Sequence, residues 1–166
     1  MDLLLREWKN EDKTRLKELC NTTDRSYLSD RIPHPYTDAD AEWWLNMVAE
    51  TDGKDGLFRA IVADGQVVGS ISIEKKADFR RVDGELGYMM LPTYWGKGIA
   101  TRAVSLLCET AFDLLSLKRV TATVFEPNKA SIRVLEKNAF VLEAKMLNAA
   151  VKNGTVYHLL QYVLLK

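Results

Sequence analysis

Apolar residues recur every three or four positions in four stretches of the chain, a spacing typical of helices with one buried face. In the second stretch, Ala41, Leu45 and Val48 fall on one helical stripe and Trp43 lies outside it. Asparagine or threonine stands at the expected N-cap of three of these stretches. We therefore predict helices over Asn10–Thr22, Thr37–Glu50, Arg102–Leu115 and Asn128–Lys137.

Runs of β-branched and other apolar residues predict strands between these helices. Asp64-Gly65 and Asn153-Gly154 each separate two such runs, which is the signal of a tight type I′ hairpin. The strands Glu85–Leu91 and Arg119–Phe125 flank a helix, so we expect them to be parallel. The pattern predicts an α/β (α+β) fold, a mixed, mostly antiparallel twisted sheet of about seven strands with helices on both faces. The other strands are expected at Leu3–Arg6, Leu57–Ala63 and Gln66–Glu74, and on either side of Asn153-Gly154.

Length and charge narrow the classes of function. The 166 residues suit a single domain spanning 1–166. Lys plus Arg and Asp plus Glu number 23 each, so net charge does not direct the chain to nucleic acid or to an anionic membrane. No apolar run approaches the roughly 20 residues that span a bilayer, and the first residues lack the basic leader of a signal peptide. We expect a cytoplasmic protein without nucleic-acid or membrane partners.

Cysteine and histidine are sparse. Cys20 and Cys108 both fall in helical patterns, which favours reduced core thiols over a disulfide. His34 and His158 are far apart in the sequence, and no cysteine pair has the spacing of metal ligands. The sequence therefore predicts no metal site.

A strand, a turn with two glycines and the start of a helix follow one another from Glu85 to Thr101. The first turn of a helix carries unpaired backbone N–H groups and a partial positive charge. Gly96 and Gly98 would let an anion approach that backbone without meeting a side chain. The order of elements predicts a turn that binds an anion such as phosphate.

The glycine spacing bears on which anion this turn would bind. It does not match the P-loop, because no Gly-Lys-Ser/Thr follows a four-residue gap. It matches the dinucleotide fingerprint poorly, since Thr101 stands where a third glycine or an alanine belongs. Glu126, at the end of the next strand, could still bind a ribose, so NAD stays open. A tight turn without any ligand is the other alternative.

The segment Pro92–Thr101 resembles the acetyl-CoA motif of the GNAT superfamily of N-acetyltransferases. More narrowly, it is similar to the RimJ/RimL-like branch, which contains the ribosomal-protein N-terminal acetyltransferases. The superfamily pattern is Arg/Gln-x-x-Gly-x-Gly/Ala, and this chain has Trp95-x-x-Gly98-x-Ala100. Tryptophan at the first place departs from the general pattern and is familiar in this branch.

Two further segments carry the same resemblance. Glu126–Phe140 is similar to the second cofactor segment of the superfamily, although Ala139 stands where the branch usually has glycine. Ile32–Leu45 resembles the acceptor-side loop and helix of the branch. The resemblance therefore covers nearly the whole chain, with the segments in the right order.

The resemblance implies acetyl-CoA as acyl donor, held where the two parallel strands splay apart. It implies direct transfer of the acetyl group to a primary amine in a ternary complex, the acceptor being a protein N-terminus or a small amine. A CoA-binding sensor or interaction module without turnover is the alternative, and a homodimer stays open. The implied cofactor contacts are Met89, Met90, Leu91, Trp95, Gly96, Lys97, Gly98, Ile99, Ala100, Thr101, Asn128 and Ser131.

The resemblance also implies two catalytic residues. Glu85, a carboxylate in a largely apolar strand, is the candidate base for the amine proton. The alternatives are that Glu85 is a sheet-edge residue or forms a structural ion pair with an arginine such as Arg80, Arg81 or Arg119. Most of the superfamily has a tyrosine in the second cofactor segment that acts as the acid for the leaving thiolate. This chain has no tyrosine in that segment, so the resemblance makes Ser131 the candidate acid. Alternatively, its hydroxyl is solvated or bonded to the backbone.

The remaining predictions concern the oxyanion and the acceptor. Backbone N–H groups near Met89 and Met90, freed by a bulge that is frequent in the family, are expected to bind the oxyanion. The acceptor is expected to lie between the loop before the second helix, that helix and the last hairpin. Its predicted contacts are His34, Tyr36, Trp43, Tyr88 and Tyr157.

Overall fold

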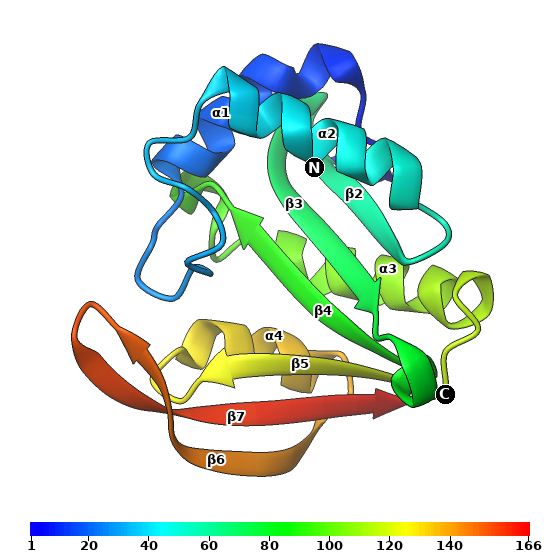
Figure 1. Ribbon diagram of the computed structural model, residues 1–166, viewed down its shortest axis with the longest axis vertical. Coiled ribbons are helices and arrows are strands. Elements are labelled where there is room, and N and C mark those ends of the chain that lie inside the picture. Colours follow the sequence, from blue (N-terminus) through cyan, green and yellow to red (C-terminus); the bar gives the residue numbers. More distant parts are fainter.

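The computed structural model describes residues 1–166, which build one seven-stranded sheet of order β1-β2-β3-β4-β5-β7-β6 (Figure 1). Every pair of neighbouring strands is antiparallel except β4 and β5, which are parallel. The predicted mixed, mostly antiparallel sheet is therefore confirmed. The strands are β1 (Leu3–Arg6), β2 (Gly56–Ala63), β3 (Gln66–Lys75), β4 (Asp83–Met90), β5 (Arg119–Phe125), β6 (Val141–Lys152) and β7 (Thr155–Leu165).

Helices cover both faces of the sheet, as predicted (Figure 1). The first two pack over one face, and the last two lie behind the opposite face in the view of Figure 1. Short 3-10 turns precede the first helix and follow β3 and β4. The helices are α1 (Lys13–Thr22), α2 (Asp38–Thr51), α3 (Ile99–Leu114) and α4 (Lys129–Lys137).

The two faces bury cores of different size. The larger core joins the sheet to α3 and α4 and contains Leu57, Ile73 and Leu107, all essentially inaccessible to solvent. The smaller core lies beneath α1 and α2 and includes Leu16 and Leu45. Burying one such aliphatic side chain contributes about 1.5–3 kcal/mol, so the larger core dominates the stability of the fold.

Local signals set several element ends where the sequence predicts them. Thr37 caps α2: its hydroxyl accepts from the Asp40 backbone N–H at 3.2 Å, and the Asp40 carboxylate accepts from the Thr37 N–H at 2.8 Å. Asp64-Gly65 and Asn153-Gly154 join their strands with positive φ at both residues. Positive φ at both central residues is the geometry of a type I′ turn, so the predicted hairpins are confirmed.

The start of the first helix differs from the prediction. Asn10–Asp12 forms a 3-10 turn, and α1 begins only at Lys13. The Asp12 carboxylate accepts from the Lys9 backbone N–H at 2.9 Å and from two guanidinium nitrogens of Arg6 at 2.7 and 2.8 Å. The Arg6 hydrogen bonds hold the pKa of Asp12 below its usual range. The predicted Asn10 cap is therefore wrong: α1 begins after Asp12, whose carboxylate binds Lys9 and Arg6 and makes no capping hydrogen bond to α1.

Both cysteines are free and buried, as expected. Burial raises the pKa of the Cys20 and Cys108 thiols to about 12, which keeps them protonated and unreactive as nucleophiles. No three His, Cys, Asp or Glu side chains gather in a way that could hold a metal ion. None of the helices combines the length and apolar character needed to cross a membrane.

Candidate active site

The strands β4 and β5 pair for only part of their length. Their parallel register begins at Asp83↔Arg119 and ends at Glu85↔Thr121. Beyond this point the two strands diverge toward their carboxyl ends, as Figure 1 shows. Each remains paired on its other side, β4 with β3 and β5 with β7. The splay that the resemblance implies is therefore present, at the carboxyl ends where α/β sheets bind ligands.

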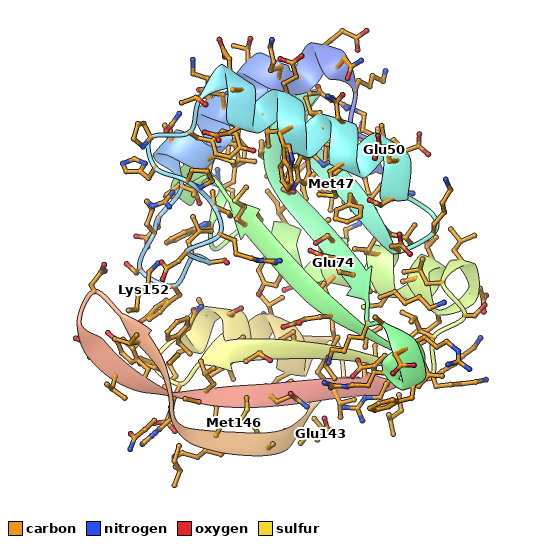
Figure 2. The ribbon with its side chains drawn as sticks, in the orientation of Figure 1. Met47, Glu50, Glu74, Glu143, Met146 and Lys152 are labelled. Carbon is orange, nitrogen blue, oxygen red and sulfur yellow. The ribbon has the colours of Figure 1, made fainter.

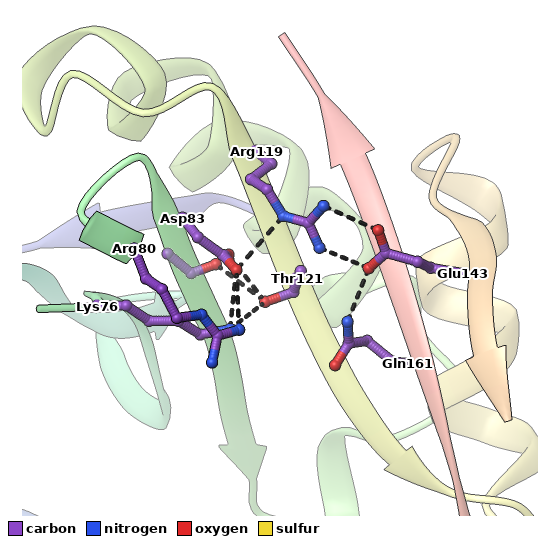
Figure 3. Close-up of polar contacts among 8 residues, drawn as sticks. Lys76, Arg80, Asp83, Arg119, Thr121, Glu143 and Gln161 are labelled. Carbon is purple, nitrogen blue, oxygen red and sulfur yellow. Dashed lines mark hydrogen bonds and ion pairs between the residues drawn. The ribbon is translucent and has the colours of Figure 1, made fainter. Parts of the chain in front are cut away.

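A charged network holds the opposite, closed end of the pair together (Figure 3). Asp83 on β4 is 3% exposed and accepts a hydrogen bond from Lys76 at 2.9 Å and one from Thr121 on β5 at 3.1 Å. Arg80 and Arg119 form ion pairs with the same carboxylate at 3.6 and 3.3 Å. The Arg119 Nε–Asp83 contact lacks the alignment of a hydrogen bond, so its attraction is electrostatic.

The closed end extends to the outer edge of the sheet. Arg119 donates to the Glu143 carboxylate of β6 at 2.8 Å, and Gln161 of β7 donates to the same carboxylate at 2.7 Å. The Arg119 hydrogen bond lowers the pKa of Glu143 below its usual value. Four neighbouring strands are therefore linked through polar side chains at one end of β5.

The splay exposes backbone N–H groups of β4. The Leu91 N–H donates to the Val68 carbonyl of β3 at 2.9 Å, and strand alternation then turns the Met89 N–H toward β3 as well. The N–H groups of Tyr88 and Met90 point the other way, toward the side that β5 has left. The register of β3 with β4 runs without a shift, so the predicted bulge is absent. The separation of the strands frees these amides instead.

The glycine turn lies directly after β4 and a 3-10 turn. Gly96 and Gly98 have φ of 73° and 75°, a region that L-residues avoid. A Cβ built on either glycine would meet no atom within 4 Å. Gly98 is the N-cap of α3 and provides no side-chain cap, so the first-turn N–H groups of Ile99–Thr101 have no side chain over them. The geometry suits an anion, as the sequence predicts.

Two aromatic side chains brace this turn. The Trp95 indole N–H donates to the Met90 carbonyl at 3.1 Å and links the turn to the end of β4. The exposed Lys97 places its ammonium 5.0 Å from the centre of the Tyr94 ring. Such a cation–π contact is worth about 0.5–1 kcal/mol at an exposed site.

Ser131 and Tyr88 meet across the splay. Asn128 caps α4 by accepting from the Ser131 backbone N–H at 3.3 Å, which fixes Ser131 in the first turn of that helix. The Ser131 hydroxyl lies 2.6 Å from the phenol oxygen of Tyr88 on β4. Burial raises the pKa of Tyr88, so the phenol stays protonated. The alternative in which the serine hydroxyl bonds to the helix backbone is not what the structure shows.

Glu85 lies exposed on the opposite face of β4 from Tyr88. The structural ion pair weighed from the sequence does not form, since Arg80 and Arg119 bind Asp83. Glu85 is instead directly opposite Glu74 of β3, another exposed carboxylate. Two like charges facing each other across a pair of strands destabilise it slightly. The face toward α1 and α2 therefore presents two neighbouring carboxylates, Glu85 on β4 and Glu74 on β3, of which Figure 2 labels Glu74.

The predicted acceptor residues have different environments. His34 and Trp43 are exposed, Trp43 to 68%. Tyr36 is only 5% exposed and packs in the core beneath α1 and α2. Tyr157 packs edge-on against Phe125 at the end of β5, with ring centres 5.4 Å apart. The structure gives Tyr36 a packing role, whereas the other three remain predicted acceptor contacts.

A buried lysine joins the last hairpin to the loop between α1 and α2. The Lys152 ammonium donates to the Asp30 carboxylate at 2.6 Å and to the Leu28 carbonyl at 2.7 Å. Figure 2 shows Lys152 where the β6–β7 hairpin approaches this loop. Tyr27, from the same loop, lies 5.3 Å from the Phe125 ring. These contacts close the end of the molecule at which β4 and β5 diverge.

Sequence reasoning missed three features of this site. Asp83 was not singled out, although it organises the closed end. The pairing of Glu74 with Glu85 was not predicted, because it depends on the register of β4 against β3. The contact of the Tyr88 hydroxyl with Ser131 was not foreseen, and Tyr88 remains a predicted acceptor contact. Strand alternation predicts that Tyr88 faces away from Glu85, but no local signal indicates Ser131 as its partner.

Comparison with known proteins gives a consistent result. The family described as Acetyltransferase (GNAT) domain matches residues 2–141. The uncharacterized N-acetyltransferase YoaA of Bacillus subtilis is 33% identical over 101 residues, which are 61% of this chain and 56% of YoaA. The putative ribosomal N-acetyltransferase YdaF of the same organism is 32% identical over 123 residues, 74% of this chain and 65% of YdaF. The chain thus spans less than two thirds of these two relatives.

A solved structure is similar to this chain over nearly its whole length. The crystal structure of a probable acetyltransferase superposes with a TM-score of 0.86 at 28% identity, covering 99% of this chain and 93% of the other. The match therefore includes both the splayed strands and the last hairpin, which lies beyond the family match.

Proposed function

This chain belongs to the GNAT acetyltransferase family, and on that premise we propose that it moves an acetyl group from acetyl-CoA directly to a primary amine. The observation that carries the proposal is the splay of β4 from β5 after Glu85, with the Gly98 turn beside it. In an N-acetyltransferase the thioester of the donor has to reach the amine of the acceptor. The gap between β4 and β5, which stay paired before it, gives the thioester a place to lie.

The residues around the splay suit acetyl-CoA. The first turn of α3 offers N–H groups to the pyrophosphate, and Lys97 adds a positive charge. Acetyl-CoA supplies an acetyl group activated as a thioester. The proposed contacts remain Met89, Met90, Leu91, Trp95, Gly96, Lys97, Gly98, Ile99, Ala100, Thr101, Asn128 and Ser131.

The proposed chemistry needs a proton removed and a negative charge held. An α-amine has a pKa of about 8 and a lysine-like amine about 10.4, so a base assists both acceptors near neutral pH. Glu85 takes this role, directly or through water, from the face opposite Tyr88. The N–H groups of Tyr88 and Met90 point into the splay and donate to the oxygen that gains negative charge.

The acceptor side favours an amine that arrives as an ammonium ion. The exposed carboxylates of Glu74 and Glu85 face each other, and Glu74 has only a long, exposed ion pair with Arg31 at 4.0 Å. A cation between the two carboxylates relieves their repulsion. Protein N-termini and small polyamines both carry an amine that is protonated to an ammonium ion near neutral pH. The name of the relative YdaF and the motif around Trp95 favour the RimJ/RimL-like branch and a protein N-terminus.

The test follows acetyl-CoA-dependent thiol release with three acceptors: a peptide with a free N-terminus, the same peptide N-terminally blocked and lacking lysine, and a polyamine. We expect turnover with a free amine and none with the blocked peptide. Glu85→Gln should lower kcat/KM about 100-fold near neutral pH and leave the acetyl-CoA Kd unchanged. A folded protein that binds no acetyl-CoA would refute the proposal.

A further inference from the structure

The hydroxyls of Tyr88 and Ser131 form a pair that bridges the splay. Tyr88 comes from β4, and Ser131 comes from the first turn of α4, which follows β5. Their oxygens are 2.6 Å apart, and each hydroxyl has the other as its hydrogen-bond partner within the protein. Both side chains are half-buried, so a ligand that enters between the strands meets this pair.

The chemistry of the two hydroxyls decides the direction of the hydrogen bond. A phenol is more acidic than an aliphatic alcohol, so Tyr88 is the better donor and the Ser131 oxygen the better acceptor. The raised pKa of Tyr88 keeps its proton in place. The serine hydrogen then has no acceptor in the protein. Because Asn128 anchors the Ser131 backbone, that hydrogen is held at the splay rather than in solvent.

We propose that Tyr88 is a positioning residue that orients the Ser131 hydroxyl as a hydrogen-bond donor to the sulfur leaving from acetyl-CoA. This inference rests on the proposed function. The amine nitrogen bonds to the acetyl carbon, and the carbon–sulfur bond breaks with its electron pair on sulfur. The amine's proton goes to Glu85 or water. Ser131 stabilises the thiolate and keeps its own proton, so the step needs no phenolate at Tyr88.

Hydrogen bonds in a chain strengthen one another, and bonds to a charged partner are the stronger class. A thiolate accepting from Ser131 gains from the bond that Ser131 accepts from Tyr88. The effect is confined to the charged sulfur, because the intact thioester carries no charge. Loss of the Tyr88 hydroxyl should therefore lower kcat and leave acetyl-CoA binding nearly unchanged.

The test compares Tyr88→Phe, Ser131→Ala and the double variant with wild type. We expect Tyr88→Phe to lower kcat about tenfold and to change the acetyl-CoA KM less than about twofold. Ser131→Ala should lower kcat at least as much, and the double variant no more than Ser131→Ala alone, because the two hydroxyls act as a unit. Tyr162→Phe removes the hydroxyl of another core tyrosine, one that has no hydrogen-bond partner within the protein; it serves as the control and should keep wild-type kcat.

A binding measurement tests the same idea without turnover. Calorimetric titrations with CoA and with acetyl-CoA are made across the pKa of a thiol, about 8.5. In wild type and Tyr162→Phe, the Kd of CoA should fall as pH rises and the thiol ionises. The Kd of acetyl-CoA, which has no thiol, should not show this fall. Tyr88→Phe and Ser131→Ala should lose most of that difference.

The outcomes separate this inference from the proposed function. Wild-type kcat in Tyr88→Phe, or losses that multiply in the double variant, would overturn the role of Tyr88 while acetyl transfer stands. An unchanged pH dependence of CoA binding in a folded Tyr88→Phe would overturn it as well. Conversely, the expected pH dependence in a protein that acetylates no amine would support the hydroxyl pair and refute the proposed function.

Discussion

The two ends of the β4–β5 pair have opposite designs. At the closed end, Asp83 is buried among Lys76, Arg80 and Arg119, and its contacts link β4 to β5. At the open end, polar backbone groups and hydroxyls face a space between the strands, and the hydroxyls of Tyr88 and Ser131 meet across it. The comparison teaches that one end supplies rigidity to strands whose other end must stay apart. The contacts of Asp83 fix the register of β4 and β5 where they pair, although the strands separate after Glu85.

The largest expected effect is at the open end, with Gly98→Trp. The side chain would occupy the space beside the first turn of α3, and we expect no measurable acetyl-CoA binding by calorimetry. Gly65→Trp is the matched control, because Gly65 also has positive φ and open space but lies in the β2–β3 hairpin. Both variants carry the left-handed strain of about 1–2 kcal/mol. Equal loss of binding in both would show that strain, and not the site, is responsible.

The next effect breaks the closed end. Asp83→Ala leaves Lys76 without its carboxylate partner and Arg119 with Glu143 alone, so we expect the free energy of unfolding to fall by about 3 kcal/mol in urea titrations. The exposed pair Lys166–Asp113 provides the control, and Asp113→Ala should leave the free energy of unfolding close to that of wild type. The acetyl-CoA Kd of the folded Asp83→Ala protein should stay within about threefold of wild type. A much higher Kd would mean that the contacts of Asp83 also determine the geometry of the open end.

A third change should leave both ends intact. Ala139, just after α4, has φ of 62° where the related branch has glycine. Ala139→Gly removes strain of about 1–2 kcal/mol, partly offset by the entropy of glycine, so we expect stabilisation by about 0.5–1 kcal/mol. The control is Ala130→Gly inside α4, which should destabilise by a similar amount. Unfolding midpoints in urea measure both. Destabilisation by Ala139→Gly would contradict the assigned strain.

The smallest expected effect is the acid sensitivity of the closed end. The Arg119 hydrogen bond lowers the pKa of Glu143, so the stabilisation is complete above the ordinary glutamate pKa of 4.5 and is lost as pH falls below it. In thermal melts between pH 7 and pH 3, Glu143→Gln should show a shallower loss of Tm. The difference should correspond to at most about 1 kcal/mol, since the pair is partly exposed. Parallel curves for both proteins would argue against this coupling.

Local sequence determined the elements of this protein. The Thr37–Asp40 capping box, the two turn dipeptides Asp64-Gly65 and Asn153-Gly154, and the Asn128 cap act over a few residues and form as predicted. The glycine turn before α3 belongs to the same class, because positive φ at Gly98 needs no distant contact. The exception is Asn10, which lies in a 3-10 turn whose last residue, Asp12, binds the preceding Lys9 N–H, so that the helix begins only at Lys13.

The tertiary structure alone decided which of these elements meet. β7 lies between β5 and β6, and the parallel pairing ends at Glu85↔Thr121. Ser131 and Tyr88 are 43 positions apart, and their contact exists because α4 begins where β5 leaves β4. Strand register and the place where two strands part depend on packing summed over the whole sheet. A pattern in the sequence records which side a residue faces, and only the assembled sheet records what it faces.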